Sequence, residues 1–484
     1  MKVSDIPAEK LEAQHKRGKL HAVERLALLF DDGLMEALIP PAEGDGVYVC
    51  AGRVGGKPVI AASQDFNFKG GSLGLKQGRN IVKAIDIAAK RRCPVVFIND
   101  SGGARVQEGI DSLAGYGEIF NRQIQLSGVI PQISVIAGPC AGGASYMPAL
   151  TDFVFAVQGI GNMFLTGPQI IEEITGEKVD KETLGGVAMH ASTSGVVHFG
   201  MPDEHSCFAE VRRLIAMLPS GRWDTAYSGY SYLKRHSLRT FELPDSTQHK
   251  PFPIRDIIDA VIDEHSLVEV HEHFARQIIV GFATIAGIRV GLIANQTAFM
   301  AGSLDCDSSD KAARFVRFCD SRGIPLVSLT DVPGFLPGRD QEMKGVIRHG
   351  AKLLYAFSEA TVPKINVIIR NAYGGAYIAM NSLHLQADVV LAWQNSSIAV
   401  MGEKGAVALL HGKEAAKLPE SERQAFIDGK LKEYREVTSN CRNALDKGYV
   451  EKIIEPRQTR QEIITHLLAL KKKRRGKRHG NIPL

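Results

Sequence analysis

The 484-residue sequence contains neither a long hydrophobic run nor a paired-cysteine motif. No stretch approaches the roughly 20 apolar residues of a membrane-spanning helix, and residues 1–20 lack the apolar centre of a secretion signal. The seven cysteines lie far apart, with no C-x-x-C spacing and no histidine at a metal-ligand spacing. These absences exclude a zinc ribbon and predict a cytoplasmic protein that does not insert into a membrane.

Familiar nucleotide-binding and hydrolase motifs are also missing. There is no G-x-x-x-x-G-K-[ST] phosphate loop, no G-x-G-x-x-G after a predicted strand and no G-x-S-x-G nucleophile elbow. His271 and His273 would share one face of a predicted strand, but no second pair of ligands accompanies them. The sequence therefore predicts no metal site and offers no obvious protein nucleophile.

Excess positive charge is confined to the end of the chain. The net charge is +5, and the run 471–478 alone carries seven positive charges, which leaves −2 for the rest. No aromatic residues interleave with this run. Such a run is typical of a solvated end, or of a site for phosphates or an acidic partner, and nucleic-acid binding is not expected.

The sequence does contain a repeat of whole-domain length. Three segments recur 232 residues later: Asp31–Glu36 as Asp263–Glu269, Ala51–Gly56 as Ala283–Ile288, and Ala141–Ala144 as Tyr373–Ala376. This interval far exceeds the roughly 20 to 50 residues of solenoid repeats, so it predicts two domains of one fold. Residues 220–253 are polar and lack periodicity, and we place the boundary there, giving domains 1–240 and 241–484.

Apolar strands alternate with helices in both halves. Helical periodicity covers residues 8–30, 79–91 and 113–126 in the first half and 310–322 and 346–359 in the second. Predicted strands at 94–98, 132–136, 325–329 and 364–369 are each followed by a glycine-containing turn. This order predicts an α/β fold in which each domain has a mostly parallel sheet.

A Gly-Gly turn joins a strand to a helix in each half, at Gly142–Gly143 and Gly374–Gly375. The first N–H groups of a helix lack partners, and glycine lets a ligand approach the backbone closely. Such amides can polarise a thioester carbonyl as it becomes an enolate. One turn alone is explained by close packing of strand and helix, but two at the same place in a repeat favour paired oxyanion sites. Because no side-chain base accompanies them, the substrates must supply their own reactive groups.

Seven stretches resemble the carboxyltransferase subunits of biotin-dependent acyl-CoA carboxylases, particularly the propionyl-CoA carboxylase β subunit and the methylmalonyl-CoA decarboxylase α subunit. They span nearly the whole chain, which makes the resemblance specific. The stretches are Asn99–Phe120, Gly138–Gly143, Asp307–Cys319, Asp331–Gly338, Ile347–Tyr355, Ala372–Tyr377 and His479–Leu484.

The resemblance implies two tandem crotonase-like domains related by internal duplication. The first would bind the acyl-CoA, with the thioester carbonyl held by Gly142 and Gly143. The second would bind carboxybiotin, with its ureido oxygen held by Gly375 and Ala376. The residues expected to bind substrate around these turns are Gly102, Gly103, Ala104, Arg105, Ala141, Tyr373, Gly374 and Ile378. Family members form hexamers in which a first domain meets a neighbour's second domain, so a homohexamer is expected.

Biotin is expected on another chain. The family's Ala-Met-Lys-Met attachment segment and an ATP-grasp region are both absent. The resemblance therefore implies a biotin carboxylase and a biotin carboxyl carrier subunit as partners, with a CoA thioester as substrate. The expected reaction transfers CO2 from carboxybiotin to the α carbon of a short acyl-CoA, with propionyl-CoA giving methylmalonyl-CoA.

Three alternatives remain open. Ile378 stands where related carboxylases commonly have aspartate, which resembles the decarboxylases and the transcarboxylase that move the carboxyl group from a malonyl-type thioester to biotin. A crotonase-type hydratase or isomerase would need a side-chain acid or base, for which Glu108 and Glu118 are the candidates. A non-catalytic assembly subunit would tolerate degenerate Gly-Gly turns, whereas both turns here are intact.

Overall fold

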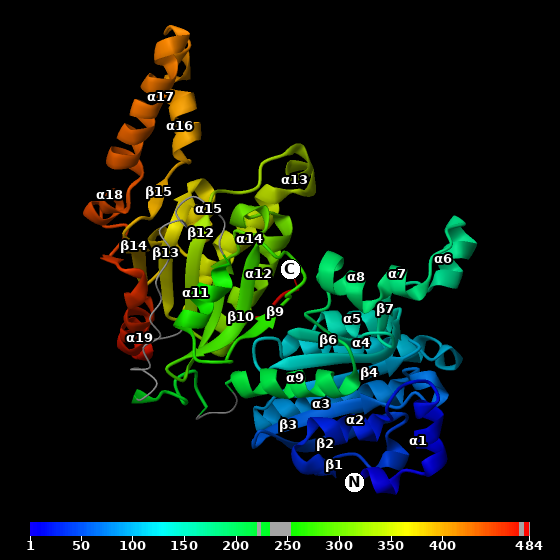
Figure 1. The fold of residues 1–484 in the computed structure, drawn as a ribbon. Coiled ribbons are helices and arrows are strands. Elements are labelled where there is room, and N and C mark those ends of the chain that lie inside the picture. Colours follow the sequence, from blue (N-terminus) through cyan, green and yellow to red (C-terminus); the bar gives the residue numbers. More distant parts are fainter. Residues whose placement is uncertain (220–223, 233–252, 474–478, 484) are drawn as a thin grey trace. The chain divides into compact units, whose positions relative to one another are not determined.

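The computed structural model describes residues 1–219, 224–232, 253–473 and 479–483, and it divides the chain into two compact units (Figure 1). The first consists of Met1–Thr225, the short segment Val270–Phe274 and the end of the chain to Pro483. The second consists of Ala226–Glu269 and Ala275–Gly476. The domain boundary predicted near residue 240 lies outside the described residues.

The first unit is built on an eight-stranded mixed sheet in the order β1-β2-β3-β4-β5-β6-β8, with β7 paired to β5. The first three strands are antiparallel, and the pairs from β3 onward are parallel. The strands are β1 Met35–Ala37, β2 Val47–Val54, β3 Lys57–Gln64, β4 Val95–Ser101, β5 Gln132–Ala141, β6 Phe153–Val157, β7 Asn162–Phe164 and β8 Phe199–Met201. The helices are α1 Ala8–His15, α2 Ala22–Leu29, α3 Leu75–Arg91, α4 Ile110–Gln125, α5 Gly143–Ala149, α6 Pro168–Thr175, α7 Lys181–Gly185, α8 Val187–Met189 and α9 Glu204–Met217.

The second unit repeats this sheet in the order β9-β10-β11-β12-β13-β14-β16, with β15 paired to β13. Its strands are β9 Val268–Val270, β10 Ile278–Ile285, β11 Ile288–Asn295, β12 Leu326–Val332, β13 Lys364–Tyr373, β14 Val389–Trp393, β15 Ser397–Ala399 and β16 Lys452–Ile454. Its helices are α11 Ile254–Val261, α12 Cys306–Arg322, α13 Arg339–Lys344, α14 Val346–Glu359, α15 Gly374–Ala379, α16 Glu403–Ala415, α17 Glu420–Tyr434, α18 Cys441–Asp446 and α19 Thr459–Ala469. The predicted duplication of an α/β domain is confirmed.

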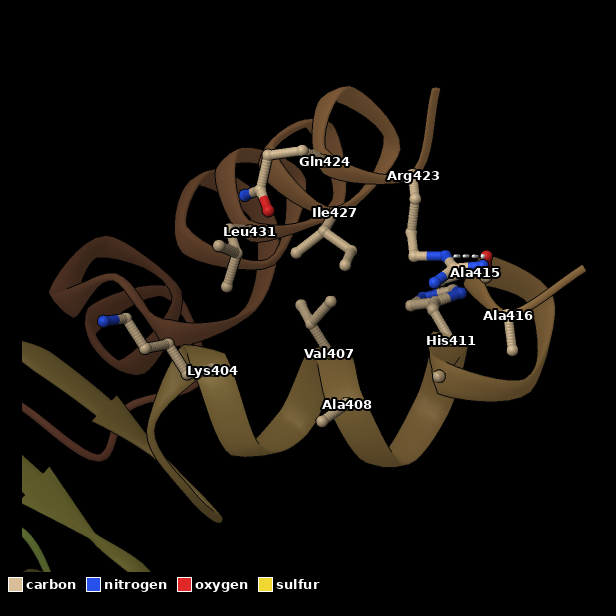
Figure 2. Close-up of a pocket in the computed structure, with 11 residues that line it drawn as sticks. Lys404, Val407, Ala408, His411, Ala415, Ala416, Arg423, Gln424, Ile427 and Leu431 are labelled. Carbon is tan, nitrogen blue, oxygen red and sulfur yellow. Dashed lines mark hydrogen bonds between the residues drawn. The ribbon is translucent and has the colours of Figure 1, made fainter. Parts of the chain in front are cut away.

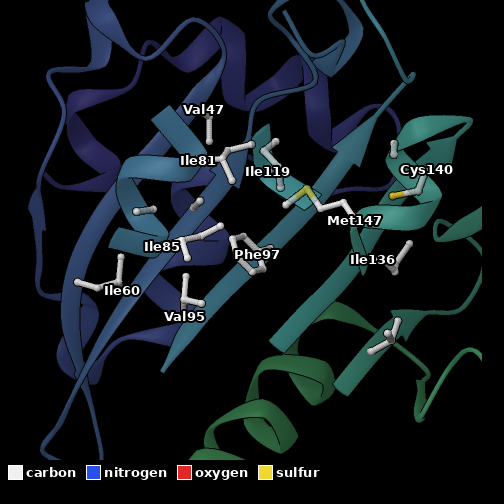
Figure 3. Packing of buried hydrophobic residues seen from close by; sticks show 14 of the residues in the cluster. Val47, Ile60, Ile81, Ile85, Val95, Phe97, Ile119, Ile136, Cys140 and Met147 are labelled. Atoms are coloured by element: carbon white, nitrogen blue, oxygen red, sulfur yellow. The ribbon is translucent and has the colours of Figure 1, made fainter. Parts of the chain in front are cut away.

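A buried apolar layer between sheet and helices explains why these segments fold as they do. In the first unit, Ile60 and Phe97 of the strands meet Ile81 and Ile85 of α3 and Ile119 of α4 (Figure 3). Ile81 and Ile85 are four residues apart and therefore lie on one face of the helix. Their alternation with polar residues is the periodicity that predicts this helix.

An aspartate anchors the first hairpin of each unit. The Asp31 carboxylate accepts hydrogen bonds from the Gly55 and Gly56 amides at 3.0 and 2.9 Å and pairs with Arg212 of α9. In the second unit, Asp263 does the same with the Ala286 and Gly287 amides, and Arg460 of α19 replaces Arg212. These contacts show that Gly56 corresponds to Gly287, so the spacing of the hairpin is 231 residues. The predicted pairing at 232 is wrong by one residue there, although it holds for the two aspartates.

Two local predictions are also wrong. The helix expected over residues 8–30 is broken into α1 and α2 because Gly18 adopts a φ of +71°. This break lets Lys19 reach the buried Asp100 carboxylate at 2.8 Å. His271 and His273 do not share a strand face, because β9 ends at Val270 and His271 adopts a φ of +59°. The His271 ring instead stacks on His198, with 4.1 Å between ring centroids.

The units differ most after their short strands β7 and β15. The first unit continues into the short helices α6 to α8, and the second continues into the long hairpin α16–α17, which extends away from its sheet (Figure 1). Each insertion begins four residues beyond a strand that pairs beside the Gly-Gly turn. Both insertions are therefore placed close to the candidate site of their own unit.

Candidate active site

The first Gly-Gly turn connects β5 to α5. Gly142 has a φ of +59°, and its amide donates a hydrogen bond of 3.0 Å to the Phe164 carbonyl of β7. Gly143 and Ala144 begin α5, and among the described residues their amides have no hydrogen-bond partner. The two amides free to hold an oxyanion are therefore those of Gly143 and Ala144, which corrects the donor role predicted for Gly142.

Tyr116 of α4 packs directly beneath this turn. A Cβ atom added to Gly143 would lie 3.0 Å from the Tyr116 ring, and the tyrosine is only 3% exposed. Burial also raises the pKa of the Tyr116 hydroxyl, so the ring stays neutral at physiological pH. Gly143 is thus required by close packing as well as by its exposed amide.

A second glycine-rich strand end lies beside the turn, as predicted. Ser101 at the end of β4 is in register with Cys140 of β5. Gly103 has a φ of +100°, and a Cβ atom there would lie 2.9 Å from the Ala141 carbonyl. The Gly103 amide hydrogen-bonds the Ser101 Oγ at 3.2 Å. The structure thus brings Gly102, Gly103 and Ala141 together, with Ala104 next along the chain, bridged to Leu73.

The predicted substrate-binding role of Arg105 does not fit the structure. Its guanidinium is buried, donating to Asp45 Oδ2 at 2.8 Å, to Glu108 Oε1 at 2.6 Å and to the Ser72 carbonyl at 2.9 Å. These partners use the charge of Arg105 to hold the loop after β4 against the start of α3. A basic residue beside a glycine-rich turn suggested an anion ligand, but the sequence gives no sign of acids 60 residues away in the chain.

Neither candidate general acid or base is placed for chemistry. Glu108 accepts from Arg105 and from the Leu75 amide at 2.9 Å, and these hydrogen bonds hold the pKa of Glu108 below its ordinary value. Its carboxylate therefore caps α3. Glu118 lies on the exposed side of α4, paired with Arg79 at 3.3 Å. The geometry gives no support to a hydratase or isomerase that relies on either group.

The second turn, between β13 and α15, has the same backbone path. Gly374 has a φ of +60°, which matches Gly142, and Gly375 and Ala376 follow as Gly143 and Ala144 do. A Cβ atom on Gly375 would lie 3.8 Å from the ring of Phe335. The Tyr373 hydroxyl contacts Asn371 Oδ1 at 3.1 Å and Ser397 Oγ at 3.0 Å, so its side chain joins β13 to β15.

Ile378 lies on the same face of α15 as Gly375, because the two are three residues apart. Its side chain is 38% exposed. It therefore presents an apolar surface next to the second turn, at the place where the predicted site has its substrate-facing wall.

Each unit carries a buried aspartate at the end of the strand that precedes its turn. Asp100 is paired with Lys19 and Arg25, and Asp331 is paired with Arg370 at 2.9 Å. Burial raises the pKa of Asp331, with Arg370 and the amide of Asn371 opposing the rise. The sequence analysis identified these aspartates only as part of the repeat. It missed their partners, whose signal was a single arginine or lysine within otherwise apolar segments.

Metal and membrane features were searched in the described part of the chain. There, no group of three or more histidine, cysteine, aspartate or glutamate side chains is arranged to hold a metal ion. Within the same residues, no helix is both long and apolar enough to cross a bilayer. Lys473 of the basic run, also described, pairs with Asp388 at 2.7 Å.

Comparison with known proteins identifies the family. The carboxyl transferase domain model matches residues 13–482. The chain is 46% identical to the propionyl-CoA carboxylase carboxyltransferase subunit of Haloferax mediterranei, covering 98% of this chain and 96% of the relative. It is also 46% identical to the methylmalonyl-CoA decarboxylase subunit alpha of Veillonella parvula, covering 98% and 95%.

A solved structure of transcarboxylase 12S, described as a hexamer assembly with methylmalonyl-coenzyme A and methylmalonic acid bound, superposes with a TM-score of 0.90 at 41% identity. The superposition covers 98% of this chain and 95% of that one. The predicted fold of two tandem crotonase-like α/β domains is thereby confirmed. By domain match, sequence identity and fold, the chain belongs to the carboxyl transferase family.

Proposed function

We propose that this protein transfers CO2 from carboxybiotin, carried on a separate chain, to the α carbon of a short acyl-CoA, with propionyl-CoA as the expected substrate. The observation that carries the proposal is the duplicated turn, in which Gly143 and Ala144 in one unit and Gly375 and Ala376 in the other follow a left-handed glycine. Membership in the carboxyl transferase family supports it.

In this proposal the two turns have different ligands. The Gly143 and Ala144 amides hold the thioester oxygen as it gains negative charge, and removal of one such donor costs about 3 kcal/mol of transition-state stabilisation. The Gly375 and Ala376 amides hold the ureido oxygen of the biotin. When bound, carboxybiotin supplies the CO2 and a basic nitrogen, which suits a site without a side-chain base. The remaining wall, formed by residues such as Ile378, keeps water away from the reacting atoms.

Biotin carboxylase and biotin carboxyl carrier subunits are the proposed partners. The chain has neither the Ala-Met-Lys-Met segment nor an ATP-grasp region, so both tasks fall to other chains. We also propose a homohexamer, supported by the hexameric description of transcarboxylase 12S.

The same half-reaction in reverse is the second candidate. The apolar Ile378 beside the second turn favours it, and the equal 46% identity to a decarboxylase subunit is consistent with it. In this direction, the protein takes the carboxyl group from methylmalonyl-CoA and gives it to biotin.

A single assay tests the shared half-reaction. The purified protein is incubated with methylmalonyl-CoA and free biotin, and propionyl-CoA is measured by chromatography. We expect propionyl-CoA to form only when biotin is present. Hydration of crotonyl-CoA without biotin, and no biotin-dependent decarboxylation, would contradict the proposal. Comparing the rates of both directions with the native carrier distinguishes the two candidates.

A further inference from the structure

The helical hairpin of the second unit contains a groove that the proposed chemistry does not use. Between α16 and α17 lies a cavity of about 450 Å³. Val407 and Ile427 point toward each other across it, and Leu431 extends its apolar lining (Figure 2). Lys404 and Arg423 also line the groove, and no carboxylate is among its 11 lining residues.

The hairpin lacks cover in a single copy of the chain. None of the 15 residues of α17 is buried. On α16, Leu409 and Leu410 are 72% and 65% exposed. Helices gain most of their stability by packing an apolar face, and clustered exposed apolar side chains mark contact surfaces. The hairpin is therefore expected to pack against another surface.

Helix α6 of the first unit has the complementary properties. It is eight residues long and has no buried residue. Ile170 and Ile174 are four residues apart on one face, and they are 49% and 75% exposed. Glu172 and Glu173 give the helix negative charge. An apolar stripe beside acids fits an apolar groove beside cations.

We propose that α6 of one copy docks into the α16–α17 groove of a second copy. Ile170 and Ile174 contact the apolar lining, and the glutamates face Lys404 and Arg423. The proposal rests on the assembly of several copies proposed above, and it names the contact that joins them.

This docking makes the active site depend on two copies. α6 begins four residues after β7, and α16 begins four residues after β15, so each helix starts within about 15 Å of chain from its strand. Those strands pair beside the Gly-Gly turns. Seating α6 in the groove therefore brings the first turn of one copy and the second turn of the other to one interface. Two-fold symmetry repeats the contact in the opposite sense.

Cross-linking between differently tagged copies tests the contact. One copy carries Ile174→Cys and the other carries Gln424→Cys, a substitution in the groove. The seven native cysteines are buried, so background reaction is small. After co-expression and treatment with a short bis-maleimide, we expect a covalent dimer containing both tags, with residues 174 and 424 joined in the peptide map. Assemblies with only one of the two substitutions should give no such product.

Two outcomes overturn the inference in distinguishable ways. If the wild-type protein is a multimer but no link between residues 174 and 424 forms, the groove assignment is wrong and the assembly stands. If the wild-type protein is a single copy by native mass, both fail, whereas the biotin-dependent assay still decides the reaction.

A substitution series measures the strength of the contact. We expect Ile174→Asp to raise the dissociation constant of the assembly about tenfold or more, because central apolar contacts dominate interface energies. Leu34→Asp, at an apolar position that is 66% exposed but remote from α6 in the sequence, is the matched control and should leave the assembly unchanged. An equal effect of the two substitutions, with unchanged circular dichroism, would contradict the docking.

Discussion

Gly143 is the residue whose replacement tests the first turn most directly. We expect Gly143→Val to lower carboxyl transfer by about 100-fold or more while the protein remains folded, because a Cβ atom 3.0 Å from the Tyr116 ring must displace the first turn of α5 and its two amides. Steady-state kcat/KM and thermal melting provide the measurements.

Gly117→Ala is the matched control for this variant. Gly117 lies on α4 next to Tyr116, and an added Cβ atom would meet no atom within 4 Å. Alanine is also a better helix former than glycine, so activity should be retained and stability slightly raised. Wild-type transfer by a folded Gly143→Val protein would remove the oxyanion role from this turn.

Ile378 is expected to influence the choice of acyl chain. Its aliphatic side chain lies beside Gly375 and is partly exposed. Replacing it with aspartate places a carboxylate that needs hydration in the wall of the site. We expect Ile378→Asp to lower kcat/KM for butyryl-CoA more than for acetyl- or propionyl-CoA, by the few-fold to 200-fold range that one methylene is worth. An unchanged ratio among the three thioesters would show that chain length is selected elsewhere.

Single residues also mark the limit of prediction from the sequence. The Gly-Gly turns were recognisable because strand, glycine and helix follow one another in the chain. The sequence does not reveal that the Gly142 amide is already bound by Phe164, since that partner comes from the later strand β7. The same applies to Arg105, whose carboxylate partner Asp45 lies 60 residues earlier. The roles of the predicted site residues in binding stay predictions.

The hairpin anchors give a prediction for whole elements. Burial raises the pKa of Asp263, but hydrogen bonds from Arg460, Thr284 and the Gly287 amide outweigh it and hold the pKa below its ordinary value. Ionised Asp263 therefore stabilises the fold above about pH 4, and this contribution is lost as pH falls through the lowered pKa. We expect Asp263→Asn to reduce the free energy of unfolding by about 2 to 4 kcal/mol at pH 7.

Denaturant titration at several pH values checks this, with Asp31→Asn as the comparison. The Asp31 side chain is 28% exposed against 8% for Asp263, so its substitution should cost less. The difference between wild type and Asp263→Asn should shrink below pH 4. A difference that stays constant down to pH 3 would show that charge is not what anchors the hairpin.

Elements were predictable where burial on one face imposes a period. The helices at 79–91 and 346–359 and the strands before each turn agree with the structure because their apolar residues face one layer. The register of the repeat at the hairpin was less predictable. Gly55–Gly56 is replaced by Ala286–Gly287, and only the hydrogen bonds to Asp31 and Asp263 reveal which residues correspond.

At the scale of the whole molecule, the proposed division of labour predicts an incomplete enzyme. We expect the purified chain to consume no ATP and to carry no covalent biotin, because the attachment segment and the ATP-grasp region are absent from its sequence. Intact mass measurement, streptavidin blotting and an ATPase assay are sufficient. Biotin found on the chain would overturn the assignment of the cofactor to a separate carrier.

The end of the chain belongs to the first unit, although the second unit lies between them in sequence. Asn481 donates from its amide to Ser127 Oγ at 2.8 Å and from its side chain to Asp152 at 3.2 Å. During synthesis, the ribosome releases residue 481 only after the whole second unit has been made. The first unit therefore waits for those two hydrogen bonds throughout translation of the second. Any tag fused behind residue 484 would start within a few residues of this latch, so an amino-terminal tag is the safer choice for expression.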